Sequence, residues 1–131
     1  MHEQAPEETT PKSLRIQSYR DLDVWKIAME LVVGIYGLTK KMPDDERFGL
    51  ISQLKRAAVS IPSNIAEGYA RSHRGDYLRF LSIARGSLAE VETQLILAVK
   101  LEYLKREDTM PAWNHSQRVG RMLTRLIQSL R

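Results

Sequence analysis

Apolar residues recur at intervals of three and four along four segments of the chain, the spacing that places side chains on one face of an α-helix. The first segment extends from about Leu22 to Lys40, and Asp21 is a suitable N-cap residue. It carries two neighbouring apolar lines instead of one. The first line comprises Leu22, Trp25, Met29, Val32 and Tyr36, and the second comprises Val24, Ala28, Leu31, Ile35 and Leu38.

Together the two lines cover more of this helix than one bundle core requires. The spacing does not decide which line faces the core and which faces another molecule. Because a contiguous exposed apolar patch usually marks an interface, we assign one line to contact with a second subunit. The residues assigned to this interface are Val24, Ala28, Leu31, Ile35 and Leu38.

The second apolar segment extends from about Asp45 to Tyr69, after a loop that begins at Met42. Pro62 lies inside it, removes one backbone N–H donor and frees the carbonyl oxygen of Ala58. Since the apolar line keeps its phase across Pro62, we predict a single kinked helix. This line comprises Ile51, Leu54, Ala58, Ile61 and Ile65.

The third and fourth segments complete the set of helices. A polar turn at 71–75 precedes a helix from about Arg74 to Leu101, and a turn at 105–109 precedes the last helix, with Asp108 or Thr109 as its cap. Pro111 is placed in the first turn of that helix, where proline is tolerated. The inward-facing positions are Tyr77, Leu81, Ala84, Leu88, Val91, Leu95 and Ala98 in the third helix, and Val119, Leu123, Leu126 and Leu130 in the fourth.

No segment shows the alternating pattern of a β-strand. The connections are short, which makes consecutive helices antiparallel neighbours. The sequence therefore predicts an all-α protein, an antiparallel up-down four-helix bundle formed by residues 19–131. Residues 1–18 contain two prolines and few apolar side chains, and they are predicted to form a flexible N-terminal tail.

Composition narrows the possible functions. The 131 residues suit one domain, and the absence of cysteine excludes disulfides, cysteine-based zinc sites and thiol catalysis. The first 13 residues are acidic and polar, unlike a signal peptide, and no segment has the ~18 apolar residues of a membrane span. We expect a cytoplasmic protein without a membrane partner.

The formal net charge is +4, and the excess of basic residues lies outside the acidic tail. Lys and Arg side chains repeated along one face can contact the phosphates of a nucleic acid, although such a stripe also occurs on ordinary solvated helices. Two basic clusters are candidate sites for RNA or DNA. They are Lys55, Arg56, Arg71, Arg74, Arg79 and Arg85 in the middle of the chain, and Arg118, Arg121 and Arg125 in the last helix.

Few residues of the sequence are candidates for binding a metal or for catalysis. None of the three histidines, His2, His73 and His115, follows a glutamate at the spacing of a di-iron bundle, so we expect no metal and no cofactor. Ser60, Ser63, Glu67 and His73 are the only arrangement that resembles a nucleophile with a base. The serines flank Pro62, where their hydroxyls can instead satisfy backbone groups. We therefore predict that the protein is not an enzyme.

One face of the second helix is polar where the rest of that helix is apolar. Three explanations remain open for it: a solvated surface, a polar network against a neighbouring subunit, or a ligand groove. The residues of this face are Arg56, Ser60, Asn64, Glu67 and Arg71.

Three motifs carry a family resemblance: SYRDLDVW at 18–25, GLISQLKRAAVSIPSNIAEG at 49–68 and FLSIARGS at 80–87. With them, residues 18–130 resemble the bacterial four-helix-bundle family named after the 23S rRNA intervening-sequence protein. The resemblance implies a homopentamer around a central channel, encoded in some cases within insertions of the large ribosomal RNA gene. A structurally similar relative is the accessory variability protein of diversity-generating retroelements, which binds nucleic acid and a reverse transcriptase. The family provides no catalytic residues.

Two hypotheses follow from the residues and the resemblance. In the first, the protein is a non-enzymatic ring that binds RNA or DNA non-specifically through its basic surfaces. In the second, it is a protein–protein scaffold or adaptor without a nucleic-acid role.

Overall fold

The computed structural model describes residues 16–131, and within this range every regular element is helical, which confirms the predicted all-α class. Residues 1–15 of the predicted tail, including His2, lie outside the described residues. Four α-helices and two short 3₁₀-helices make up the fold. In chain order they are η1 (Tyr19–Asp21), α2 (Asp23–Thr39), η2 (Asp44–Glu46), α3 (Leu50–Tyr69), α4 (Arg74–Lys100) and α5 (Arg106–Leu130).

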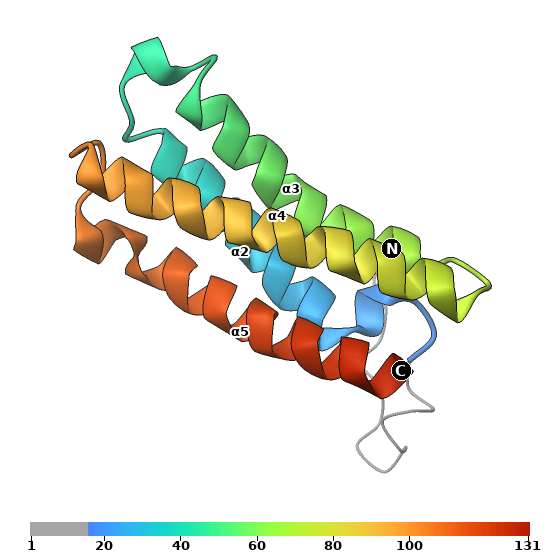
Figure 1. Ribbon diagram of the computed structural model, residues 1–131. Helices are drawn as coiled ribbons and strands as arrows, with labels where there is room; N and C mark the ends of the chain where they lie inside the picture. Colours follow the sequence, from blue (N-terminus) through green and yellow to red (C-terminus); the bar gives the residue numbers. More distant parts are fainter. Residues whose placement is uncertain (1–15) are drawn as a thin grey trace.

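The four α-helices form one bundle in which consecutive helices run in opposite directions (Figure 1). Each helix packs against the next along the chain, and α5 returns to pack against α2. This arrangement is the up-down topology that short connections favour. None of the helices in the described part of the chain is long and apolar enough to cross a membrane.

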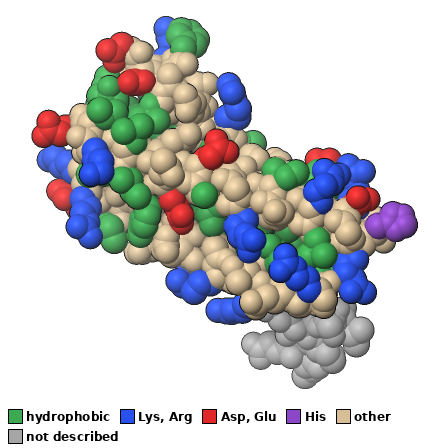
Figure 2. Space-filling view, in the orientation of Figure 1, with side chains coloured by type: hydrophobic (Ala, Val, Ile, Leu, Met, Phe, Trp, Pro, Cys, Tyr) green, Lys and Arg blue, Asp and Glu red, His purple; other side chains and the backbone are tan. Residues whose placement is uncertain are grey.

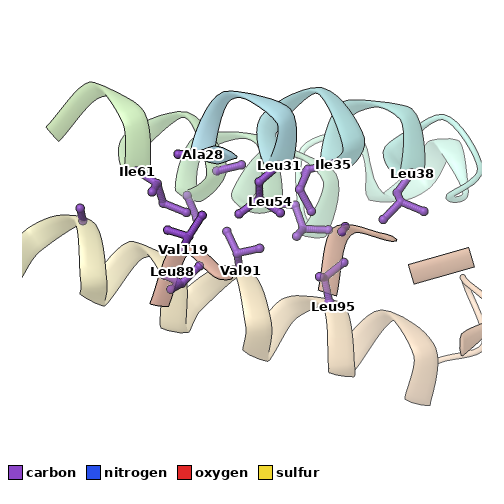
Figure 3. Close-up of a cluster of buried hydrophobic side chains, with 14 of the residues drawn as sticks. Ala28, Leu31, Ile35, Leu38, Leu54, Ile61, Leu88, Val91, Leu95 and Val119 are labelled. Carbon is purple, nitrogen blue, oxygen red and sulfur yellow. The ribbon is translucent and has the colours of Figure 1, made fainter. Parts of the chain in front are cut away.

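The core runs along the centre of the bundle and takes side chains from all four helices (Figure 3). The predicted apolar line of α3 is buried throughout, and that of α4 is buried except for the half-buried Tyr77. In α5, Val119 and Leu123 are buried as predicted, whereas Leu126 and Leu130 are only partly buried. Ile127 takes the next core position, because it continues the four-residue step from Val119 and Leu123.

The two lines of α2 have the opposite roles to those predicted, so the interface assignment was wrong. The line assigned to another subunit is buried in the core of this chain. The other line, which we call the outer line, is only partly covered: Leu22, Trp25 and Val32 pack against the core, and Met29 and Tyr36 are exposed. A physical reason is that the outer line carries Trp25 and Tyr36, whose N–H and O–H groups need polar partners when buried, whereas the inner line is wholly aliphatic. The buried residues are Val24, Ala28, Leu31, Ile35 and Leu38.

The start of α2 also differs from the prediction. Asp21 does not cap α2, which begins at Asp23 after Leu22, a residue without a side-chain cap. Instead, the Asp21 carboxylate accepts hydrogen bonds from the backbone N–H groups of Gln17 (2.8 Å) and Ser18 (3.1 Å). These bonds lower the pKa of Asp21. They complete a capping box around η1, in which the Ser18 hydroxyl accepts from Arg20 N–H (3.1 Å).

The starts of α3 and α5 are shifted as well. Helix α3 is continuous through Pro62, as predicted, but it begins at Leu50, five residues later than expected. Helix α5 begins at Arg106, so Thr109 lies inside it and donates its hydroxyl to the Arg106 carbonyl (2.7 Å). Pro111 consequently lies beyond the first turn of α5. Sequence patterns place helix centres better than their ends.

Candidate nucleic-acid interface

Basic side chains gather on the face formed by α4 and α5 (Figure 2). A groove of about 550 Å³ runs between these helices. We call it the basic groove. It is lined by Arg85, Leu88, Ala89 and Glu92 of α4 and by Ser116, Gln117, Gly120, Arg121, Thr124 and Arg125 of α5.

Small side chains make the basic groove possible. A Cβ atom added to Gly120 would lie 3.4 Å from Leu88 Cδ2, so α5 approaches α4 closely at this point. Ser116 is buried beside it, and its hydroxyl donates to the Trp113 carbonyl (2.7 Å) within α5. With little side-chain volume at these positions, the exposed side chains of Arg85, Arg121 and Arg125 stand beside a hollow instead of a filled surface.

The arginines of the basic groove are available for an anion. Within residues 16–131, neither Arg85, Arg121 nor Arg125 forms an ion pair. The one acid in the groove, Glu92, accepts a hydrogen bond from Gln117 Nε2 (2.8 Å), so an amide and not a guanidinium is its partner. The groove therefore has three positive side chains for one negative side chain.

The two predicted basic clusters are rearranged by the fold. Arg118 is exposed on α5, one turn before Arg121, so the predicted stripe of α5 lies along the outside of this helix next to the basic groove. From the other cluster, only Arg85 reaches the groove. Antiparallel packing brings it opposite Arg121 and Arg125, although it lies far from them in sequence.

The remaining residues of the middle cluster are dispersed over other faces. Lys55 lies over the ring of Tyr36 (4.8 Å from the centroid), and Arg56 lines a separate pocket between α3 and α4. Arg74 donates to the carbonyl of Leu130 (3.2 Å) at the end of the bundle. These contacts show that the middle cluster is not one surface.

Arg71 and Arg79 pack on the buried ring of Phe80. Their guanidinium carbons lie 4.8 Å and 4.5 Å from its centroid, respectively. Arg71 is also paired with Glu67 (3.0 Å). The Arg71–Phe80 contact joins the end of α3 to α4, whereas the Arg79–Phe80 contact lies within α4.

The polar face of α3 is a junction with α4. The Ser60 and Ser87 hydroxyls share a hydrogen bond (2.8 Å), and Asn64 Nδ2 donates to the carbonyl (2.7 Å) and hydroxyl (2.9 Å) oxygens of Ser60. Further along, Gln94 Nε2 donates to Gln53 Oε1 (3.4 Å). The centre of this face is therefore a polar network within the same chain, which differs from the predicted alternative of a network against a neighbouring subunit.

The residues considered for catalysis are not assembled. Ser60 is bonded to Ser87 and Asn64, Glu67 is paired with Arg71, and His73 is exposed at the N-cap of α4. Neither Ser60 nor Ser63 has a hydrogen bond to an acid or a histidine in the part of the chain described. Likewise, no group of three potential metal ligands occurs between residues 16 and 131.

The sequence analysis did not predict two exposed apolar side chains and one apolar groove. Val33 is 72% exposed and Phe48 is 88% exposed, and neither belongs to a predicted line. The run Leu31-Val32-Val33 contained a signal, because three successive residues of a helix cannot all face one core. A second groove between α4 and α5, lined mainly by apolar side chains including Met110 and Trp113, was also not predicted.

Comparison with known proteins identifies a matching family and a similar solved structure. Residues 20–125 match the sequence profile of the family described as 23S rRNA-intervening sequence protein. A crystal structure of a protein with unknown function from the S23 ribosomal protein family of Bacteroides thetaiotaomicron is similar, with 30% sequence identity and a TM-score of 0.74. The similarity covers 79% of this chain and 97% of that chain. Among curated proteins, none matches.

Proposed function

The chain belongs to the 23S rRNA-intervening sequence protein family, and on this premise we propose that it is a non-enzymatic ring, a homopentamer, that binds RNA or DNA through the phosphate backbone. The family name connects its members with ribosomal RNA. The observation that carries the proposal is the convergence of Arg85, Arg121 and Arg125 from two helices on one groove.

The charge of α5 supports binding to an anion. Residues 109–131 contain no Asp or Glu, so nothing in this segment opposes the arginine stripe. Each Lys or Arg that neutralises a phosphate releases condensed counterions, which makes affinity fall with salt. The basic groove and the neighbouring Arg118 offer four such side chains per subunit.

The side chains around the basic groove favour contact with phosphates over reading of bases. Base stacking requires accessible aromatic rings among the cations, and no aromatic residue lines this groove. Phe80 is buried beneath Arg71 and Arg79, and Tyr77 is half-buried. We therefore expect binding without sequence preference.

Exposed apolar side chains support an oligomer. Beside the exposed Val33, the outer line of α2 includes Met29 and Tyr36, which are also exposed. A monomer would leave this patch in water, whereas a closed ring can cover a matching patch on every subunit. A ring also multiplies the basic groove, so that weak phosphate contacts add through avidity.

The test compares two variants of equal charge. Arg121→Gln/Arg125→Gln removes two cations of the basic groove, and the control Lys40→Gln/Lys105→Gln removes two exposed cations without ion pairs from the other end of the bundle. In a mobility-shift titration of structured RNA, the groove variant is expected to bind more weakly. Its salt dependence should also flatten by about one unit of log–log slope for each lost phosphate contact. Equal effects of the two variants would contradict the assignment of the site.

The second candidate function is a protein–protein adaptor, which the exposed outer line of α2 favours. The same titration separates the two functions. If micromolar wild-type protein does not shift RNA or DNA at low salt, nucleic-acid binding is excluded. The adaptor function then predicts that one specific polypeptide co-purifies with the protein.

A further inference from the structure

The most exposed large hydrophobic side chain of the described residues lies in the connection between α2 and α3. Phe48 is 88% exposed, and we call the segment Asp44–Gly49 the Phe48 loop. The Arg47 guanidinium carbon lies 5.1 Å from the centroid of the Phe48 ring. A phenylalanine side chain gains substantial free energy when it leaves water, and the contacts within this chain leave most of this ring in solvent.

The Phe48 loop is held in place at its base. Glu46 Oε1 accepts the backbone N–H of Leu50 (3.0 Å), and Glu46 Oε2 accepts the hydroxyl of Tyr103 (2.8 Å) in the connection between α4 and α5. The loop is therefore anchored to two parts of the fold. A ring presented from an anchored loop loses less conformational freedom on binding than one on a free segment.

A groove of suitable chemistry lies at the same end of the bundle. It has a volume of about 380 Å³, within the range of sites that bind small organic groups. Unlike the basic groove, it is mainly apolar, and we call it the apolar groove. It is lined by Leu95, Ile96, Val99 and Lys100 of α4 and by Arg106, Thr109, Met110 and Trp113 of α5.

The charges around the two features are complementary. Asp44 and Asp45 precede Phe48, are exposed, and form no ion pair with the described chain. Lys100 and Arg106 line the apolar groove and are likewise exposed and unpaired. A Phe48 loop that entered the groove would thus bring two carboxylates towards two cations, and such complementarity selects the partner and its orientation.

We propose that the Phe48 loop of one subunit inserts into the apolar groove of a neighbouring copy, with the Phe48 ring against Met110 and Trp113. The loop and the groove lie at the same end of the bundle but on different faces (Figure 1). The contact is therefore heterologous, and repetition from copy to copy with the bundles side by side can close a ring. This inference rests on the oligomer proposed above and adds a second contact to the one proposed for the outer line of α2.

Cysteine cross-linking tests the contact directly, because the chain contains no natural cysteine. The full-length single variants Phe48→Cys and Met110→Cys are mixed and oxidised. The matched control mixes Phe48→Cys with Ile83→Cys, since Ile83 (42% exposed) is about as exposed as Met110 (37%) and lies in the first half of α4, outside the apolar groove. A disulfide needs Cα atoms within about 7 Å, so we expect a mixed dimer only with Met110→Cys. Equal yields from both mixtures would overturn the proposal.

Charge reversal provides a second measurement that also controls for misfolding. Asp44→Lys/Asp45→Lys and Lys100→Asp/Arg106→Asp should each raise the dissociation constant of the oligomer by about tenfold or more in sedimentation experiments. Combining the four substitutions should restore assembly, which damage to the fold cannot do. Failure of the combined variant to recover, with helix content unchanged, would count against the proposed pairing.

The proposed oligomer and the proposed Phe48 contact can be disproved independently of each other. If wild-type protein sediments as a monomer at tens of micromolar, both are wrong. If wild-type protein and Phe48→Ala sediment as the same oligomer with equal dissociation constants, only the Phe48 contact is wrong. A folded Phe48→Ala variant that dissociates more readily than the wild type supports both.

Discussion

At the scale of single residues, Gly68 shows how closely two helices approach. A Cβ atom added to it would lie 2.9 Å from Phe80 Cβ and 3.0 Å from Tyr77 Cδ1. The backbone of Gly68 does not adopt a positive φ, so packing alone requires the glycine. Gly86 of α4 differs, because an added Cβ atom would meet no atom of the described chain within 4 Å.

The same substitution should therefore have opposite effects at these two positions. Gly68→Ala forces α3 and α4 apart and is expected to destabilise the protein by about 1–3 kcal/mol. Gly86→Ala only improves helix propensity and is expected to stabilise it by up to ~1 kcal/mol. Urea denaturation of both variants measures the difference. A destabilising Gly86→Ala would instead indicate that a neighbouring subunit packs against that face.

At the scale of elements, one carboxylate joins two connections of the bundle. The Glu46 carboxylate accepts hydrogen bonds from the backbone N–H of Leu50, the first residue of α3, and from the hydroxyl of Tyr103. Both bonds lower the pKa of Glu46, and the bond from Leu50 has the larger effect. The bond with Glu46 in turn raises the pKa of Tyr103. The end of the bundle that carries the Phe48 loop thus depends on an ionised Glu46 and a protonated Tyr103.

This carboxylate predicts a dependence of stability on pH. A lowered pKa in the folded state means that the contribution of Glu46 is present above the ordinary pKa of about 4.5 and is lost as pH falls below it. Glu46→Gln should therefore lower Tm at pH 7 and reduce the further loss of Tm in acid. Thermal unfolding between pH 7 and 3 measures both effects. Glu30→Gln, at an exposed carboxylate without a hydrogen bond to any of residues 16–131, is the control and should change neither.

At the scale of the whole molecule, the α4–α5 face carries two grooves of different chemistry. The basic groove lies beside the middle of α4 and the middle and second half of α5, and the apolar groove lies beside the end of α4 and the start of α5. The same helix pair can therefore contact a phosphate backbone and a neighbouring subunit at once. The proposed contact uses Met110 and Trp113 of the apolar groove and none of the three arginines of the basic groove.

A ring predicts that stability depends on protein concentration. Association stabilises the folded subunit by mass action, so Tm should rise as the protein is concentrated from about 1 to 100 µM. Phe48→Ala should flatten this rise without a change in helix content. Calorimetry or circular dichroism measures both. A wild-type Tm that is independent of concentration would contradict an oligomer that assembles in this range.

The sequence by itself determined the fold class, the helices and the family. Intervals of three and four residues between apolar positions show which side of each helix is apolar. Short connections between the helices make consecutive helices antiparallel. These properties are local, so they can be read from successive residues. The motifs at 18–25, 49–68 and 80–87 together indicated the family that the match over residues 20–125 confirms.

Only the tertiary structure decided which faces meet. Both lines of α2 satisfy the helical spacing, but the fold buries the line of Leu31 fully and covers the outer line, which carries Trp25 and Tyr36, only in part. Arg85 lines the same groove as Arg121 and Arg125 because of how α4 and α5 are rotated about their own axes and positioned along the bundle. Periodicity reports the orientation of a side chain about its own helix axis. How two helices are positioned against each other depends on the packing of the whole core, at contacts such as Gly120 against Leu88.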